Sequence, residues 1–277
     1  MIAFFLTAVI SHTLHAKDVL EPPANPPAGL WSAVSEDERQ PIEVKLSEGP
    51  KVRGWLYKSA RPDAPFVLFF YGSNEDLVHE AARLKWLRDA FQVNAVCFDY
   101  PGYGFSQGSI DARLVLSAAL QEFDHVREHL ASPAVPIISY GWSIGTGIAI
   151  HVAAHRAAAG LILQAPPASA REMMQWSTQR EVPWYGRWLI KLTADPLVGD
   201  LYEGSAHILA VASPLLLIQG QFDDVVSPQQ GREVFDASPA KEKTFVEIPG
   251  AHHNDLKYQQ APASDAVGRF LQNFASP

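Results

Sequence analysis

The sequence is poor in cysteine, has no concentration of basic residues and has no apolar run that suits a membrane span. Cys97 is the single cysteine among 277 residues, so neither an intrachain disulfide nor a cysteine zinc site can form. The formal net charge is -8 without a Lys and Arg cluster, which argues against nucleic acid and anionic membrane surfaces as partners. Because 47% of the residues are hydrophobic, we expect one large core in a single domain over residues 41–277.

The N-terminus resembles a secretory signal. Residues 2–10 are apolar apart from Thr7, and Ala16 offers a small residue for cleavage before Lys17. This stretch is shorter than the roughly 20 apolar residues of a membrane helix, so no integral membrane span is expected. The pattern predicts a signal peptide over residues 1–16 and a secreted or periplasmic protein. An uncleaved anchor and a misassigned start are alternatives, and the latter would make the protein cytoplasmic.

Proline marks the next segment. Residues 21–27 contain four prolines, which fix φ and remove backbone donors, so they can neither continue a helix nor join a central strand. We expect a proline-rich linker over residues 17–40.

Strand and helix patterns alternate through the remainder of the chain. This alternation is typical of an α/β fold with a mostly parallel, doubly wound sheet, here of about eight strands. Strands are predicted over 41–46, 52–57, 66–71, 94–98, the run before Gly141, 161–164, 214–220 and 244–248, and helices over 76–91, 112–130, 146–155 and 264–274.

About fifty residues between Gln164 and Ser213 interrupt the alternation and contain no predicted strand. Such an insertion follows a central strand and therefore lies at the carboxyl edge of the sheet, where ligands bind in this class. We expect a small helical cap over about 166–212. Its apolar face would line an acyl pocket, or its aromatic residues would merely attach the cap to the body. The pocket candidates are Trp142, Met173, Trp176, Trp184 and Trp188.

A nucleophile elbow is indicated by the segment Gly141-Trp142-Ser143-Ile144-Gly145. An apolar strand run precedes it and a helix of small residues follows it. In such an elbow the serine at the apex exposes its hydroxyl, and glycines two positions away avoid collisions with the folded-back chain. Ser143 is therefore the candidate nucleophile.

A serine nucleophile needs a base to accept its proton and a carboxylate to orient that base. Asp223 follows the strand predicted over 214–220, and His253 follows the strand predicted over 244–248. The adjacent Asp224 and His252 are alternatives to them, and the motif spacing of the family resemblance described below favours Asp223 and His253. The order serine, aspartate, histidine is that of the α/β hydrolases.

Negative charge develops on the substrate's carbonyl oxygen when the serine attacks. Two backbone N–H donors can stabilise this charge, and together they form an oxyanion hole. Ile144 supplies one because it follows the nucleophile at the start of a helix. The second is expected from the loop of residues 71–76, where Ser73 is the candidate.

Together these motifs resemble the α/β-hydrolase superfamily, and most of all its BEM46-type serine hydrolases. The resemblance also covers Phe98-Asp99-Tyr100-Pro101-Gly102-Tyr103-Gly104 and runs from about residue 50 to residue 272. It implies hydrolysis of acyl esters or thioesters without a cofactor. Relatives usually carry His-Gly where this chain has Tyr71-Gly72, and they use cysteine clusters, absent here, for membrane attachment.

The sequence thus predicts a serine esterase or thioesterase that acts on a small-molecule substrate, without an evident obligate protein partner. A serine peptidase or amidase with the same three residues is the first alternative, and a non-catalytic binding domain is the second. The pairs His151 and His155, and His125 and His129, have a spacing that can bind metal, but neither includes the glutamate of a zinc-hydrolase helix. We therefore expect no metal site.

Overall fold

The protein is built on an eight-stranded sheet with the strand order β10-β9-β7-β6-β4-β5-β3-β2. The computed structural model describes residues 10–14, 20–23, 36–181, 183, 190–194, 201–256 and 258–275. Strand β3 is antiparallel to both β2 and β5, and the other neighbours are parallel. The prediction of a mostly parallel sheet with about eight strands is confirmed. The strands are β2 (Gln40–Lys45), β3 (Lys51–Tyr57), β4 (Phe66–Phe70), β5 (Asn94–Phe98), β6 (Ile137–Trp142), β7 (Gly160–Gln164), β9 (Leu215–Gly220) and β10 (Lys243–Ile248).

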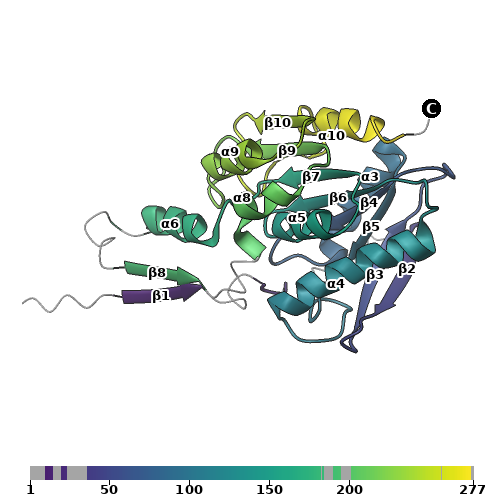
Figure 1. Ribbon diagram of the computed structural model, residues 1–277, viewed down its shortest axis with the longest axis horizontal. Coiled ribbons are helices and arrows are strands. Elements are labelled where there is room, and N and C mark those ends of the chain that lie inside the picture. The colour runs from purple at the N-terminus through teal and green to yellow at the C-terminus, as the bar shows by residue number, and fades with distance from the viewer. Residues whose placement is uncertain are drawn as a thin grey trace, which may run out of the picture.

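Helices cover both faces of this sheet (Figure 1). Helices α3 and α10 contact each other on one face, while α4, α5, α8 and α9 form a chain of contacts on the other. The helices are α3 (Leu77–Phe91), α4 (Ala112–His125), α5 (Gly145–His155), α6 (Ala170–Glu181), α8 (Gly204–His207), α9 (Pro228–Ala237) and α10 (Ala263–Gln272), with a π-helical turn at Val126–Leu130 and 3-10 turns at Glu36–Glu38 and Ile208–Ala210.

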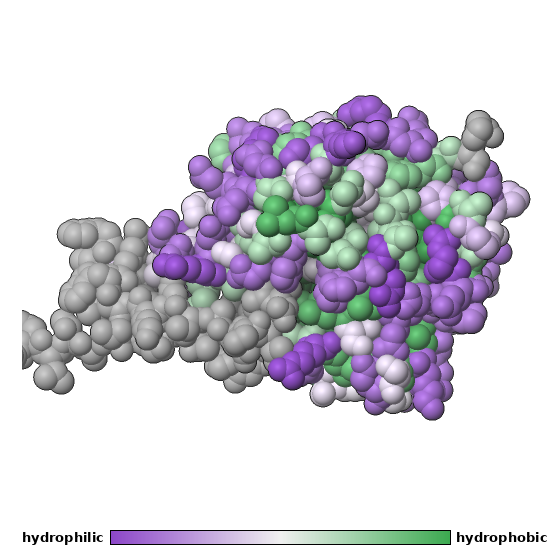
Figure 2. All heavy atoms as spheres, in the orientation of Figure 1, coloured by the Kyte–Doolittle hydropathy of each residue, from purple (hydrophilic) through white to green (hydrophobic). Residues whose placement is uncertain are grey.

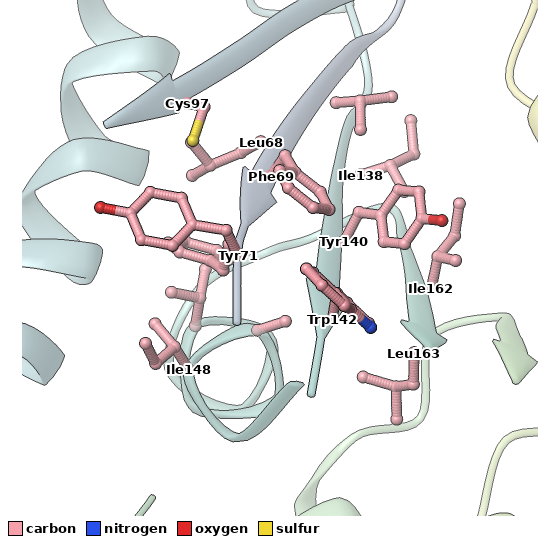
Figure 3. Packing of buried hydrophobic residues seen from close by; sticks show 14 of the residues in the cluster. Leu68, Phe69, Tyr71, Cys97, Ile138, Tyr140, Trp142, Ile148, Ile162 and Leu163 are labelled. Carbon is pink, nitrogen blue, oxygen red and sulfur yellow. The ribbon is translucent and has the colours of Figure 1, made fainter. Parts of the chain in front are cut away.

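The core lies between the central strands and these helices. Every residue of β4, β5, β6, β7 and β9 is buried, as expected for strands that helices cover on both sides. Phe69 of β4 and Tyr140 of β6 meet edge to face with 5.1 Å between ring centroids, and Figure 3 shows both beside Trp142. The continuous apolar runs in the sequence are therefore the strands of the sheet's centre.

A second, two-stranded sheet was not expected. Strand β1 (Ile10–Leu14) pairs in parallel with β8 (Ile190–Ala194), beside helix α6 (Figure 1). The prediction that the insertion after β7 contains no strand is therefore wrong. The sequence of β8, Ile-Lys-Leu-Thr-Ala, alternates apolar and polar residues, which is the pattern of a half-buried strand. Because β1 lies within residues 1–16, cleavage after Ala16 would remove it, and both the signal peptide and the location stay predictions.

The segment expected to be a linker contacts the body of the protein at its described residues. Leu20 is fully buried in the core. The carbonyl of Glu21 accepts a hydrogen bond of 2.9 Å from the N–H of Asn74. Residues 20 and 21 therefore support the loop that follows β4, which is where Ser73 lies.

The surface seen in Figure 2 carries apolar side chains over α5 and α8. A hollow of about 560 Å³ lies there between helices, and Leu209 at its edge is 63% exposed. Across the described parts of the chain, none of the helices combines the length and apolar character that a membrane crossing requires.

Candidate active site

Four loops that carry the predicted site residues leave the sheet at one edge. Parallel strands β4, β6, β9 and β10 end there, and they are followed by Ser73, Ser143, Asp223 and His253. Residues far apart in the chain meet because the carboxyl ends of parallel strands lie side by side, at the edge where open α/β sheets bind ligands.

Ser143 occupies a strained turn between β6 and α5. Its φ is 53°, in the left-handed region that side chains other than glycine disfavour. A Cβ at Gly141 would lie 2.5 Å from Cα of Thr146, and one at Gly145 would lie 2.5 Å from the carbonyl oxygen of Tyr71. The two glycines therefore allow the close approach that places the serine hydroxyl at the sheet edge.

His253 lies between Ser143 and Asp223. Its Nε2 is 3.0 Å from Oγ of Ser143, and its Nδ1 is 2.9 Å from Oδ2 of Asp223. An ionised carboxylate can only accept hydrogen bonds, so Nδ1 carries the proton. In the neutral imidazole Nε2 is then the acceptor, which is the state that can take a proton from the serine hydroxyl.

Asp223 is held by several donors. Its Oδ1 accepts from the N–H groups of Val225 and Val226 at 2.9 and 2.7 Å, and its Oδ2 accepts from Nε2 of Gln219 at 3.1 Å. The side chain is buried, so these donors meet the hydrogen-bonding needs of a carboxylate that solvent does not reach. They also fix its direction toward the imidazole.

The neighbouring acid and histidine lie elsewhere. Oδ1 of Asp224 is 3.7 Å from Nδ1 of His252, and both side chains are substantially exposed. Geometry therefore brings Asp223 and His253 to Ser143 and leaves Asp224 and His252 as a separate surface pair.

The proposed oxyanion donors have free N–H groups. Within the described chain, no acceptor is found for the N–H of Ile144 or of Ser73. Ile144 precedes α5 with helical backbone angles, so its N–H belongs to the unsatisfied donors of a helix start. Ser73 lines the same cleft as Ser143.

Tyr71 is fully buried and does not line the cleft. Its hydroxyl donates to Oδ1 of Asp99 at 3.3 Å and accepts from the N–H of Tyr100 at 3.0 Å. The same Asp99 oxygen accepts from the N–H of Leu77 at 2.9 Å. Asp99 therefore binds both ends of the loop that carries Ser73.

A cleft of about 310 Å³ surrounds the Ser143 hydroxyl. Of the predicted acyl-pocket residues, Trp142 lines it, and its ring stacks against His253 with 6.1 Å between centroids. Met173 packs against the core, and Nε1 of Trp176 donates to the carbonyl of Asp224 at 3.3 Å, so the described cleft does not include either. Trp184 and Trp188 lie outside the described residues.

The sequence reasoning missed several residues around this site. Glu75 and Asn254 line the cleft, and a second hollow of about 230 Å³ behind Trp142 is lined by Arg83 and Gln164. Glu75 could have been noticed as an acid on the predicted oxyanion loop. Arg83 gave no such signal, because a basic residue inside an amphipathic helix ordinarily faces solvent.

Both histidine pairs with metal-ligand spacing lie within the described residues. The rings of His151 and His155 are 4.3 Å apart, and those of His125 and His129 are 4.8 Å apart, each pair along one helical segment. Among the residues with described positions, no group of three or more His, Cys, Asp or Glu side chains could hold an ion.

Comparisons with known proteins agree with this architecture. The family described as Chlamydia CHLPS protein (DUF818) matches residues 40–160. An uncharacterized protein of Mycobacterium tuberculosis is 27% identical over 84% of this chain and 79% of its own length. The alpha/beta hydrolase domain-containing protein 17C of Mus musculus is 26% identical over 80% of this chain and 66% of its own length.

Solved structures share the fold at low identity. An esterase of Pyrococcus furiosus superposes with a TM-score of 0.68 and 16% identity, covering 93% of this chain and 98% of the esterase. Acetyl xylan esterase 1 from Thermoanaerobacterium gives a TM-score of 0.64 and 14% identity, covering 94% and 98%. These likenesses show the α/β-hydrolase fold.

Proposed function

We propose that this α/β-hydrolase-fold protein is a serine hydrolase that cleaves acyl esters or thioesters. The observation that carries the proposal is the hydrogen-bonded series from Ser143 through His253 to Asp223, with distances of 3.0 and 2.9 Å. Two solved neighbours are described as esterases, which favours the ester class. The quoted motifs further favour a BEM46-type enzyme.

Acylation begins when Oγ of Ser143 attacks the carbonyl carbon and its proton passes to Nε2 of His253. The electron pair of the carbonyl moves to oxygen, where the N–H groups of Ser73 and Ile144 stabilise the charge. Asp223 stabilises the imidazolium that forms. The tetrahedral intermediate then collapses, His253 gives its proton to the leaving oxygen or sulfur, and the acyl group stays on Ser143.

Deacylation repeats these steps with water. His253 takes a proton from a water molecule, the resulting hydroxide attacks the acyl-enzyme, and the same N–H groups hold the oxyanion. The proton returns through His253 to Oγ of Ser143, and a carboxylic acid leaves. The cycle requires only water as a co-reactant.

Removal of the nucleophile tests the proposal. Ser143→Ala should lower kcat for a p-nitrophenyl ester by about five orders of magnitude, because triad residues act as a unit. The matched control is Ser177→Ala, an exposed serine of α6 that hydrogen-bonds Glu181. Full ester hydrolysis by Ser143→Ala, in protein free of host esterases, would refute the mechanism. A fluorophosphonate probe that fails to label folded wild type at Ser143 would instead favour a non-catalytic binding domain.

Cleft size sets an expectation for the acyl chain. At about 310 Å³ the cleft is at the small end of ligand pockets. We therefore expect kcat/KM in a p-nitrophenyl ester series to be highest for short to medium acyl groups and to fall for long ones. An optimum at long chains would contradict this expectation.

The peptidase or amidase alternative uses the same three side chains. Parallel assays on an ester and on an aminoacyl amide distinguish it from the esterase.

A further inference from the structure

The cleft around Ser143 contains a carboxylate that the mechanism does not use. Glu75 is half-buried in its wall, two residues after Ser73. Of the described residues that line the cleft, Glu75 alone carries a formal negative charge and none is Lys or Arg. Its carboxylate has no hydrogen-bond or ion-pair partner within the described part of the chain.

Helix capping does not account for this carboxylate. Glu75 lies just before helix α3, where negative charge is favourable. However, Asp76 already caps that helix, since its Oδ1 accepts from the N–H groups of Val78 and His79 at 2.9 and 3.0 Å. Glu75 therefore remains available to a group inside the cleft.

Ionisation of Glu75 in these surroundings costs free energy unless a cation lies next to the carboxylate. Burial raises the pKa of Glu75 to about 7, and the charges of Glu80 and Asp76 add to the rise while His79 and Arg83 oppose it. His253 also lines the cleft. Arg83 is already engaged, with Nε 2.7 Å from Glu80 and Nη1 3.1 Å from Gln164. A half-buried carboxylate without a partner gains most from a ligand that brings a positive charge or N–H donors.

We propose that Glu75 makes this site selective for esters that carry an ammonium group within a few bonds of the scissile carbonyl. The proposal deepens the proposed function and rests on it for turnover. The ammonium donates hydrogen bonds to, or pairs with, the Glu75 carboxylate while the carbonyl oxygen lies at the N–H groups of Ser73 and Ile144. The ammonium can belong to the acyl group, as in an aminoacyl ester, or to the alcohol or thiol, as in a choline ester.

Two pairs of isosteric substrates test the selectivity and distinguish these sources. Alanine methyl ester is compared with methyl isobutyrate, in which a methyl group replaces the ammonium. Butyrylthiocholine is compared with S-(3,3-dimethylbutyl) thiobutyrate, in which carbon replaces the quaternary nitrogen. Because the positive charge itself makes each cationic ester more reactive, kcat/KM is first divided by the rate constant for hydroxide-catalysed hydrolysis of the same ester, and the ratio compares these normalised values within each pair. We expect the ratio to favour the cationic member of at least one pair by about tenfold, as for a hydrogen bond or ion pair to a charged partner. A ratio near one in both pairs overturns the proposal.

Variants of Glu75 test whether the preference for the cationic ester comes from this side chain. Glu75→Gln should reduce the ratio to about one, and Glu75→Lys should invert it. The matched control is Glu128→Gln, because the Glu128 side chain is 68% exposed on the π-helical turn after α4, and the ratio should not change. Retention of the cationic preference in folded Glu75→Gln would overturn the proposal. Melting temperatures of all variants establish that they are folded.

The pH dependence of the ratio gives a second measurement. Butyrylthiocholine keeps its charge at every pH, so its preference over the neutral thioester should grow as pH rises from about 6 to 8 and Glu75 ionises. Any pH effect on the catalytic steps that the two thioesters share cancels in the ratio. A ratio that is flat across this range contradicts the assignment to Glu75.

Binding to Ser143→Ala separates failure of this proposal from failure of the proposed function. Calorimetry with the intact esters does not require turnover. Tighter binding of the cationic esters, together with no hydrolysis by wild type, would refute the serine hydrolase and retain the cation site. Hydrolysis that depends on Ser143, with equal binding within each pair and a normalised ratio near one, would refute the cation site alone.

Discussion

Single residues set the reactive geometry. Ser143, at a φ of 53°, is held in a conformation that costs about 1–3 kcal/mol for a residue with a side chain. The cost is offset by the packing of β6 and α5, whose residues on either side of the turn are buried. The strain exposes the hydroxyl to His253, so its location supports a role in chemistry.

The choice between two adjacent aspartates is a prediction at this scale. Asp223→Asn should lower kcat by about 10⁴-fold, because an amide cannot hold the imidazole with Nδ1 protonated. Asp224→Asn is the matched control and should change kcat less than about threefold, since Asp224 pairs with His252 at the surface. Steady-state hydrolysis of one short ester measures both. Equal losses in the two variants would contradict the assignment of the acid.

At the scale of elements, the loop between β4 and α3 is positioned by a buried aspartate from another strand. Asp99 follows β5, and its Oδ2 also accepts from the N–H of Phe105 at 2.8 Å. Burial raises the pKa of this carboxyl to about 6. One side chain thus joins the loop that carries Ser73 to the loop after β5.

Asp99→Ala should destabilise the protein by about 2–4 kcal/mol, since the buried N–H of Leu77 and the partly buried N–H of Phe105 each lose a hydrogen bond to its carboxylate. It should also lower kcat/KM, because the loop that carries Ser73 loses its anchor at both ends. Denaturant unfolding and ester hydrolysis measure the two effects. The control Asp63→Ala removes an exposed carboxylate that pairs with Arg61 at 3.6 Å and should change neither. Unaltered stability of Asp99→Ala would show that the hydrogen bonds of Asp99 are dispensable.

For the whole molecule, a buried acid on α4 couples stability to pH. Burial raises the pKa of Glu122 to about 8, and the charge of Asp99 adds to the rise. Oε1 of Glu122 has no hydrogen-bond partner in the described structure. Between about pH 4.5 and 8 the folded protein therefore holds a proton that the unfolded chain has released. Stability should fall as pH rises through this window, by at most about 1.4 kcal/mol per pH unit from this group.

Glu122→Gln removes this titration. We expect its melting temperature to depend less on pH over the window and to exceed that of wild type at pH 8, because a neutral amide replaces a carboxylate that must ionise in the core. Thermal unfolding from pH 5 to 8 measures the slope. Glu128→Gln, which changes an exposed glutamate six residues along the chain, should leave the slope as it is. A wild-type slope in Glu122→Gln would assign the pH dependence to other groups.

The sequence by itself determined the central strands and the turn at Ser143. A strand covered on both faces must be apolar throughout, and a tight strand-to-helix turn must have small residues at fixed positions, so both leave a local pattern. The mostly parallel sheet, and with it the edge that its strand ends share, followed from the alternation of strands and helices. Ser143, Asp223 and His253 could be predicted to lie at this edge because each of them follows a predicted strand.

Only the tertiary structure decided which side chains meet. Three contacts link residues that have no periodic relation in sequence: β1 pairs with β8, Glu21 accepts a hydrogen bond from Asn74, and Glu75 lies in the cleft beside Ser143. The structure also places Asp223, and not Asp224, against His253. Local pattern fixes which face of an element is buried. Contacts between loops depend instead on where the packed sheet brings their ends together, and that is a property of the whole fold.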